Sequence, residues 1–269
     1  MPVRRETFAV TGPAPAVEVR NTAGSVLVTA VDGASTLSVD LEALNSAAEE
    51  LLDEVTVQYL DGAPGRLVVA VPPSRLLSSP RFAVTATAPA GCPLTVATAS
   101  AATTVRGPWG DLDATTASGD LRVEECTGLA VRTASGDLQA GTVSGDAAVR
   151  SASGDVRVDT VAGSTTATTA SGDVVLGTVD GDVEVSTASG DVSVGRVGDG
   201  EVALRTVSGD ATVAVAPGLR LWLDLQTVSG RLDSQLSSED ADGEAGDGTA
   251  ALTVRMRSVS GDLRLRRAG

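Results

Sequence analysis

The 269-residue chain has no His, no Lys and only five aromatic side chains: Phe8, Tyr59, Phe82, Trp109 and Trp222. The lack of His removes the commonest general base and zinc ligand. The lack of Lys excludes a Schiff-base mechanism and a P-loop. A formal charge of −15 and so few aromatics argue against binding to nucleic acid. Ile is also missing while Val, Ala, Gly and Arg abound, which indicates a high-GC genome of actinobacterial type.

Long apolar runs are also missing. The longest, residues 67–71, has the length of a strand and is far too short to span a bilayer, and residues 1–7 lead into no signal-peptide core. We therefore expect a cytoplasmic protein with no membrane insertion. Cys92 and Cys126 stand alone, with no Cys-x-x-Cys spacing, and are predicted to be buried thiols rather than a disulfide or a redox pair.

What the sequence does contain is a nine-residue repeat from about residue 112 onward. Its central phrase is Ala/Val-Ser-Gly-Asp followed by alternating apolar and polar residues, as in Val156-Arg157-Val158. Period-two alternation is typical of a strand with one buried face. Gly supplies a backbone that can adopt positive φ, and Ser and Asp hydrogen-bond their own turn, so each phrase is interpreted as a corner between two short strands.

A second regularity doubles the period. The residue at the start of each phrase alternates between small and large, from Ala134 and Val143 to Ala188 and Val197. The true repeat is therefore about 18 residues, which predicts a chain that coils once per repeat and stacks like side chains on like. A lone coil cannot offset the conformational entropy of ordering it, whereas stacked coils share strand hydrogen bonds and a core. The fold class predicted is an all-β, single-stranded β-helix or β-solenoid.

Residues 1–75 are expected to form an N-terminal β-rich cap, and residues 76–269 the solenoid proper. Ser46 and Glu49 resemble a capping box for one short amphipathic helix, and strands are expected at residues 56–59 and 67–69. An acidic, Gly-rich stretch at about 234–249 is interpreted as a loop inserted between coils. The chain ends in an alternating strand, residues 263–267, whose outward Arg side chains would deter end-to-end stacking or contact a phosphate or nucleic acid.

Stacking at about 4.8 Å would align one Asp from each coil in a column along one edge. Neighbouring carboxylates at that spacing repel by roughly 1 kcal/mol in water. The column must therefore be solvated, locally hydrogen-bonded or bridged by cations, and a calcium-binding β-roll remains an alternative. The column would consist of Asp120, Asp137, Asp155, Asp173, Asp191 and Asp210.

The repeated Thr-Ala-Ser-Gly-Asp-Val-x-Val phrase resembles that of the bacterial β-strand-repeat family labelled putative adhesins, a toast-rack-like family of unknown function. The resemblance extends from about residue 15 to the end of the chain. Residues 17–24 form a degenerate copy of the phrase. It implies a right-handed solenoid and carries no catalytic residues to transfer.

These observations favour a non-enzymatic scaffold that binds a protein or a polysaccharide through its solenoid faces. We assign no catalytic, cofactor-binding or metal-binding residue and expect no cofactor. The chain would be a monomer or would self-associate through solenoid ends. A calcium-stabilised β-roll is the first alternative. Remote alternatives are an ice-binding face of repeated Thr and Ser, and a polysaccharide-acting enzyme that uses outward arginines: Arg122, Arg150, Arg157 and Arg205.

Overall fold

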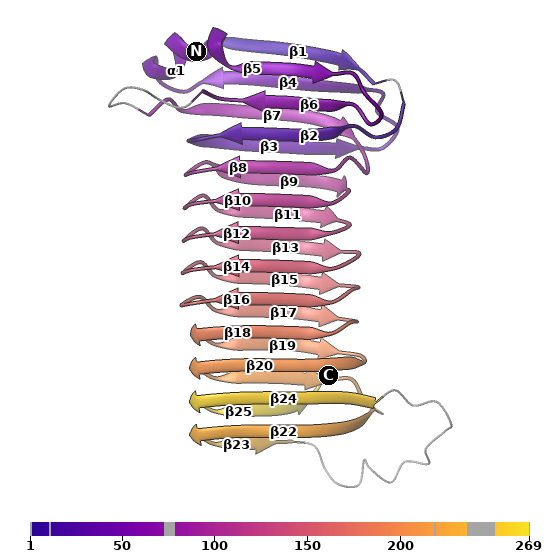
Figure 1. Cartoon of the computed structure of the whole chain (residues 1–269), viewed down its shortest axis with the longest axis vertical. Coiled ribbons are helices and arrows are strands. Elements are labelled where there is room, and N and C mark those ends of the chain that lie inside the picture. The colour runs from indigo at the N-terminus through magenta and orange to yellow at the C-terminus, as the bar shows by residue number, and fades with distance from the viewer. Residues whose placement is uncertain (1, 11, 73–78, 218, 236–250, 269) are drawn as a thin grey trace. The chain divides into compact units, whose positions relative to one another are not determined.

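The computed structural model describes residues 2–10, 12–72, 79–217, 219–235 and 251–268. The chain divides into two compact units, residues 1–140 (unit 1) and residues 141–269 (unit 2). In each unit, successive turns of the chain supply one strand to each of two long, mainly parallel sheets (Figure 1). This confirms the predicted all-β solenoid. Strand β13 (Leu138–Val143) spans the division.

Unit 1 holds a region of mixed strand direction followed by regular rungs. Its first sheet has the strand order β1-β4-β7-β3-β9-β11, and its second sheet has the order β5-β6-β2-β8-β10-β12. The strands of the first sheet are β1 (Val3–Ala9), β3 (Gly24–Val31), β4 (Thr36–Ala43), β7 (Phe82–Pro89), β9 (Ala102–Trp109) and β11 (Leu121–Cys126). Those of the second are β2 (Ala16–Asn21), β5 (Thr56–Leu60), β6 (Arg66–Ala70), β8 (Leu94–Thr98), β10 (Leu112–Thr116) and β12 (Leu129–Thr133).

The N-terminal strands close one end of unit 1 with antiparallel pairs. β4 pairs antiparallel with both β1 and β7, and β5 pairs antiparallel with β6, which confirms the two strands expected at residues 56–59 and 67–69. The expected helix is α1 (Ser46–Leu51), followed by a 3₁₀ helix (Leu52–Glu54). Its N-cap is Asn45 rather than Ser46: the Asn45 side-chain oxygen accepts a hydrogen bond from the Ala48 amide at 3.0 Å. None of the described helices is long and apolar enough to cross a bilayer.

Unit 2 consists of parallel rungs throughout. Sheet A of this unit has the strand order β15-β17-β19-β21-β25-β23, and sheet B has the order β14-β16-β18-β20-β24-β22. The strands of sheet A are β15 (Val156–Val161), β17 (Val174–Val179), β19 (Val192–Val197), β21 (Ala211–Val215), β23 (Leu232–Ser234) and β25 (Leu263–Arg267). Those of sheet B are β14 (Ala147–Ser151), β16 (Thr165–Thr169), β18 (Val183–Ser189), β20 (Gly200–Ser208), β22 (Arg220–Ser229) and β24 (Ala251–Ser260).

The core of unit 2 is a stack of aliphatic layers in register. β15 pairs with β17 and β17 with β19, so that Val161, Val179 and Val197 lie directly above one another, each with no exposed surface. The small residues of the alternation are exposed instead: Ala152 and Ala170 lie at the other corner of the coil. Like side chains therefore stack on like, as the 18-residue period predicted, and the large member of each pair fills the core.

Two glycines of the Ser-Gly-Asp corners, Gly209 and Gly261, have positive φ as predicted, whereas the earlier ones are required for a different reason. Gly172 and Gly190 do not adopt positive φ; instead, a Cβ atom on Gly172 would lie 2.1 Å from the carbonyl oxygen of Gly154, one coil earlier. A Cβ on Gly190 would likewise lie 2.3 Å from the carbonyl oxygen of Gly172. A hydroxyl three residues before the glycine closes the corner, as where Thr169 Oγ1 accepts a hydrogen bond from the Gly172 amide at 3.1 Å. The corners are therefore glycine because successive coils approach too closely for a side chain.

The last strands of unit 2 do not stack in sequence order. β24 pairs with β20 on one side and with β22 on the other, and β25 lies in the same way between β21 and β23 (Figure 1). The rung formed by β22 and β23 is therefore the outermost one, although β24 and β25 end the chain. The alternating strand expected at residues 263–267 is confirmed as β25, but it has a neighbour on both sides and so does not lie at the stack end where its arginines were expected to act. Most of the predicted acidic loop, from residue 236 onward, lies outside the described residues.

Candidate functional site

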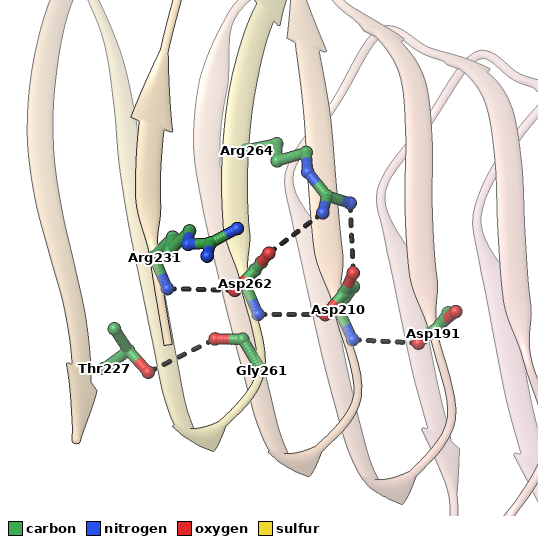
Figure 2. Close-up of polar contacts among 7 residues, drawn as sticks. All are labelled: Asp191, Asp210, Thr227, Arg231, Gly261, Asp262 and Arg264. Atoms are coloured by element: carbon green, nitrogen blue, oxygen red, sulfur yellow. Dashed lines mark hydrogen bonds and ion pairs between the residues drawn. The ribbon is translucent and has the colours of Figure 1, made fainter. Parts of the chain in front are cut away.

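The aspartate column has a clear structural role. In unit 2, the Oδ1 atom of each column Asp accepts a hydrogen bond from the backbone amide that follows the glycine one rung further on. Asp173 Oδ1 accepts from the Asp191 amide at 2.8 Å. Asp191 Oδ1 likewise accepts from the Asp210 amide at 2.8 Å (Figure 2). In unit 1, Asp120 Oδ1 accepts from the Asp137 amide at 3.2 Å. Each carboxylate thus holds the corner of the neighbouring coil.

The column also follows the rearranged order of the last rungs. Asp210 Oδ1 accepts from the Asp262 amide, and Asp262 Oδ1 accepts from the Arg231 amide, both at 2.9 Å (Figure 2). The guanidinium of Arg264 lies between these carboxylates, 3.0 Å from Asp210 Oδ2 and 3.0 Å from Asp262 Oδ2. At this end of the column, an arginine therefore offsets the like-charge repulsion that the sequence predicted.

The described residues offer neither a metal-binding cluster nor a reactive thiol. Within the described ranges, no group of three or more Asp, Glu or Cys side chains is placed to hold a metal ion. Cys92 and Cys126 are buried free thiols, as predicted. Burial raises the pKa of Cys92 to about 11, and burial together with the nearby Asp111 and Glu125 carboxylates raises the pKa of Cys126 to about 12. Both thiols are therefore neutral near pH 7.

The outward arginines singled out in the sequence do not form one group. Arg150 lies on β14 in sheet B, whereas Arg157 lies on β15 in sheet A, where it pairs with Asp159 at 3.3 Å. Arg122 is exposed on β11 of unit 1. Arg205, on β20, has other arginines beside it, and these come from β24.

We call the outward side of β20, β24 and β22 the arginine face. Arg257 lies directly beside Arg205 in the register of the parallel strands, and Arg255 projects on the same side two residues before Arg257. These three arginines line a shallow hollow of about 210 Å³ together with Glu201, Ala203 and Leu204. Ala203 is the in-register neighbour of Arg255, and its short side chain leaves the space that the longer residues surround.

Aromatic and acidic groups complete this face. Trp222, on the outermost strand β22, is 53% exposed, and the Arg255 guanidinium carbon lies 5.3 Å from the centroid of its ring. Arg255 also pairs with Glu201, and Arg257 lies 3.6 Å from Asp224. Arg205 makes no ion pair with any described residue. The arrangement can therefore bind an anion and offer an aromatic surface beside it.

An apolar ridge borders the arginine face at the neighbouring corner. Val207, Val259 and Val228 are 54%, 50% and 83% exposed, and they occupy the corner position where earlier coils of unit 2 have Ala. Sequence reasoning missed both the face and the ridge. Arg205 and Arg257 lie side by side only because β24, rather than β22, stands next to β20. One signal in the sequence did indicate which rung is outermost. Arg231 stands where the other phrases have the column Asp, and the outermost rung needs no such Asp because no further amide lies beyond it.

A family model and several solved structures match this chain. The family model described as Toastrack DUF4097 matches residues 59–266. A protein from Bacteroides fragilis described as a putative adhesin is 11% identical, with 98% of this chain and 97% of that chain covered and a TM-score of 0.45. A putative lipid binding protein from Parabacteroides distasonis is 15% identical, with 98% and 96% covered and a TM-score of 0.45.

A putative adhesin from Parabacteroides merdae is 11% identical, with 97% of this chain and 95% of that chain covered and a TM-score of 0.40. No match was found among curated proteins. The family model spans well over half of the sequence and includes every Ser-Gly-Asp rung from residue 117 onward. The chain therefore belongs to the DUF4097 toastrack family.

Proposed function

We propose that this chain is a non-enzymatic, adhesin-like binding protein that engages another macromolecule through the outward faces of its solenoid sheets. The observation that carries the proposal is the composition of the last rungs of unit 2. Arg205, Arg255, Arg257 and Trp222 gather on one outward face there, next to an exposed Val ridge. Trp and Arg are the side chains most enriched at the energetic centres of interfaces, and exposed apolar patches mark interaction sites.

The regular coils support the same proposal. In β15, β16 and β17, the side chains between the buried ones are exposed or half-buried, so these strands present rows of outward side chains. Such an extended surface suits a large partner better than a small substrate, which is normally enclosed by a concave pocket.

The test is capture of a partner by the purified full-length chain from envelope, extracellular-matrix and soluble fractions of the source organism. We expect a specific partner to be retained by the wild-type chain and lost with the triple variant Arg205→Gln, Arg257→Gln and Trp222→Ala. Arg196→Gln is the matched control, because Arg196 is an exposed arginine on β19 in the opposite sheet. Failure to recover any partner, or equal loss with the control, would contradict the proposal.

A further inference from the structure

We propose that the arginine face binds an acidic polysaccharide, one whose sugar units carry carboxylate groups. This inference rests on the proposed function and names the partner class of the same site. The charge around the hollow differs in sign from that of the whole protein. Residues 200–269 hold eight Arg and ten Asp or Glu in the sequence, a net charge of −2. The hollow itself is lined by three Arg and one Glu, although the chain as a whole carries −15. A locally basic surface on an acidic protein attracts anionic polymers to that surface alone.

The spacing of the cationic groups suits a polymer that runs across the strands. Arg205 and Arg257 lie on adjacent parallel strands in register, so their backbones are about 4.8 Å apart. This separation is close to the length of one pyranose unit. A guanidinium binds a carboxylate through two parallel N–H···O bonds, so neighbouring arginines can hold the acid groups of one chain segment.

The hollow supplies a place for the sugar ring. Ala203 lies between longer side chains, and the resulting space of about 210 Å³ is open along the sheet. The half-exposed Trp222 ring offers an apolar surface to the C–H groups of a pyranose. Glu201 and Asp224, which already pair with Arg255 and Arg257, add oxygen atoms that can accept hydrogen bonds from sugar hydroxyls.

Other anionic polymers fit these features less well. A nucleic acid needs several stacking platforms or a long run of cationic groups, whereas Trp222 is the sole aromatic residue from position 200 onward. An acidic protein could use the arginines and the Val ridge, but it would not need the open hollow over Ala203. A second copy of this chain is also acidic, and association between copies is therefore one outcome that the experiment must detect.

The experiment is titration of the full-length chain with polygalacturonate and alginate, followed by calorimetry or affinity electrophoresis. Neutral dextran, duplex DNA and polyglutamate serve as comparison probes, and sedimentation reports the oligomeric state. We expect saturable binding to the uronate polymers, weaker binding to DNA and polyglutamate, and none to dextran. Arg257→Gln should weaken uronate binding about tenfold, and Arg205→Gln similarly. Arg196→Gln, the matched charge change on the opposite sheet, should leave it unchanged.

Trp222→Ala separates this inference from simple charge attraction. It should weaken uronate binding while leaving the net charge, and the slight affinity for polyglutamate, unchanged. Binding that is equal for DNA, polyglutamate and uronates, or equally weakened by Arg196→Gln, would overturn the inference. So would association between copies without any uronate binding. If uronates do not bind but a protein partner is captured through the arginine face, the proposed function stands and the polysaccharide inference fails.

Discussion

Asp173 illustrates how one residue holds two neighbouring coils together. Its amide donates to Asp155 Oδ1 at 3.0 Å, and its own Oδ1 accepts from the Asp191 amide at 2.8 Å. The side chain is exposed, and an oxygen acceptor rather than a negative charge is what the neighbouring corner needs.

Asp173→Ala should therefore lower the free energy of unfolding by about 0.5–1.5 kcal/mol, the usual net value of one hydrogen bond. Asp173→Asn should be neutral or slightly stabilising, because the amide oxygen still accepts and the repulsion from the flanking carboxylates falls. Urea denaturation, combined with hydrogen exchange at the Asp191 amide, measures both variants. Equal destabilisation by Ala and Asn would show that the charge itself matters.

Gly172 tests the requirement for close approach between coils. Gly172→Ala should destabilise the chain by about 1–3 kcal/mol, the cost of forcing an extra carbon into a packed site. The added Cβ would meet the Gly154 carbonyl oxygen at 2.1 Å. Gly198→Ala is the control, since the nearest atom to its added Cβ is Asp180 Oδ1 at 3.8 Å. Thermal unfolding of both variants measures the difference, and similar melting temperatures would contradict the steric explanation.

The two buried cysteines predict a dependence of stability on alkaline pH. Their pKa values are raised from 9.0 to about 11 for Cys92 and about 12 for Cys126. A raised pKa in the folded state means that the unfolded chain loses these protons first. The thiols therefore favour folding fully below pH 9, and this contribution is lost as the pH rises toward 12.

Thiol titration checks this prediction. At pH 8 both cysteines should react slowly with an aromatic disulfide reagent in the folded chain and rapidly in denaturant. Cys92→Ser combined with Cys126→Ala should flatten the fall in stability between pH 9 and pH 11. Rapid modification of the native chain would show that the thiols are more accessible than the structure indicates.

At the scale of strands and helices, the sequence predicted the regular rungs well. Alternation in Val156-Arg157-Val158 and the 18-residue period depend only on local pattern, and β15 and its neighbours match both. Two details depended on three-dimensional context. The N-cap is Asn45 because its side chain reaches the Ala48 amide, and the corner glycines are needed for contacts with the coil before.

The order of the last rungs could not be derived from the pattern alone. The phrases at residues 228–231 and 259–262 both fit the register of the phrase at 207–210, so either could follow it in space. Burial separates them: Leu252, Val254 and Met256 of β24 are fully buried, whereas Leu223 of β22 is 39% exposed. The inner strand is thus covered on both sides, whereas the outermost strand keeps apolar surface exposed.

Truncation after residue 235 tests this arrangement. Among described strands, β22 pairs with β24 alone and β23 with β25 alone, so removal of β24 and β25 should leave β22 and β23 without neighbours. We expect the backbone amides of β22 and β23 to lose protection from hydrogen exchange, while those of β16 and β17 keep theirs. If β22 and β23 remain protected, they must be able to re-pair with β20 and β21.

At the scale of the whole molecule, the question is whether an ion contributes to the stability of the stacked coils. Column carboxylates in both units already accept hydrogen bonds from backbone amides, and Arg264 bridges the pair at Asp210 and Asp262. Melting curves recorded with calcium and with a chelator should therefore superimpose. A rise in melting temperature with calcium, absent with magnesium, would instead favour the calcium-stabilised β-roll.

The inner position of β24 and β25 has a consequence for how the protein is made. The ribosome releases β22 and β23 before their only described neighbours have been synthesised. Most rungs can be added to the nascent solenoid one after another, each onto the last, as repeat proteins allow. The final step cannot follow that scheme, because the newest segment has to enter between two older ones. Folding of this end must therefore wait until β24 and β25 have left the ribosome, and a chain that lacks them would leave an unfinished strand edge open to aggregation.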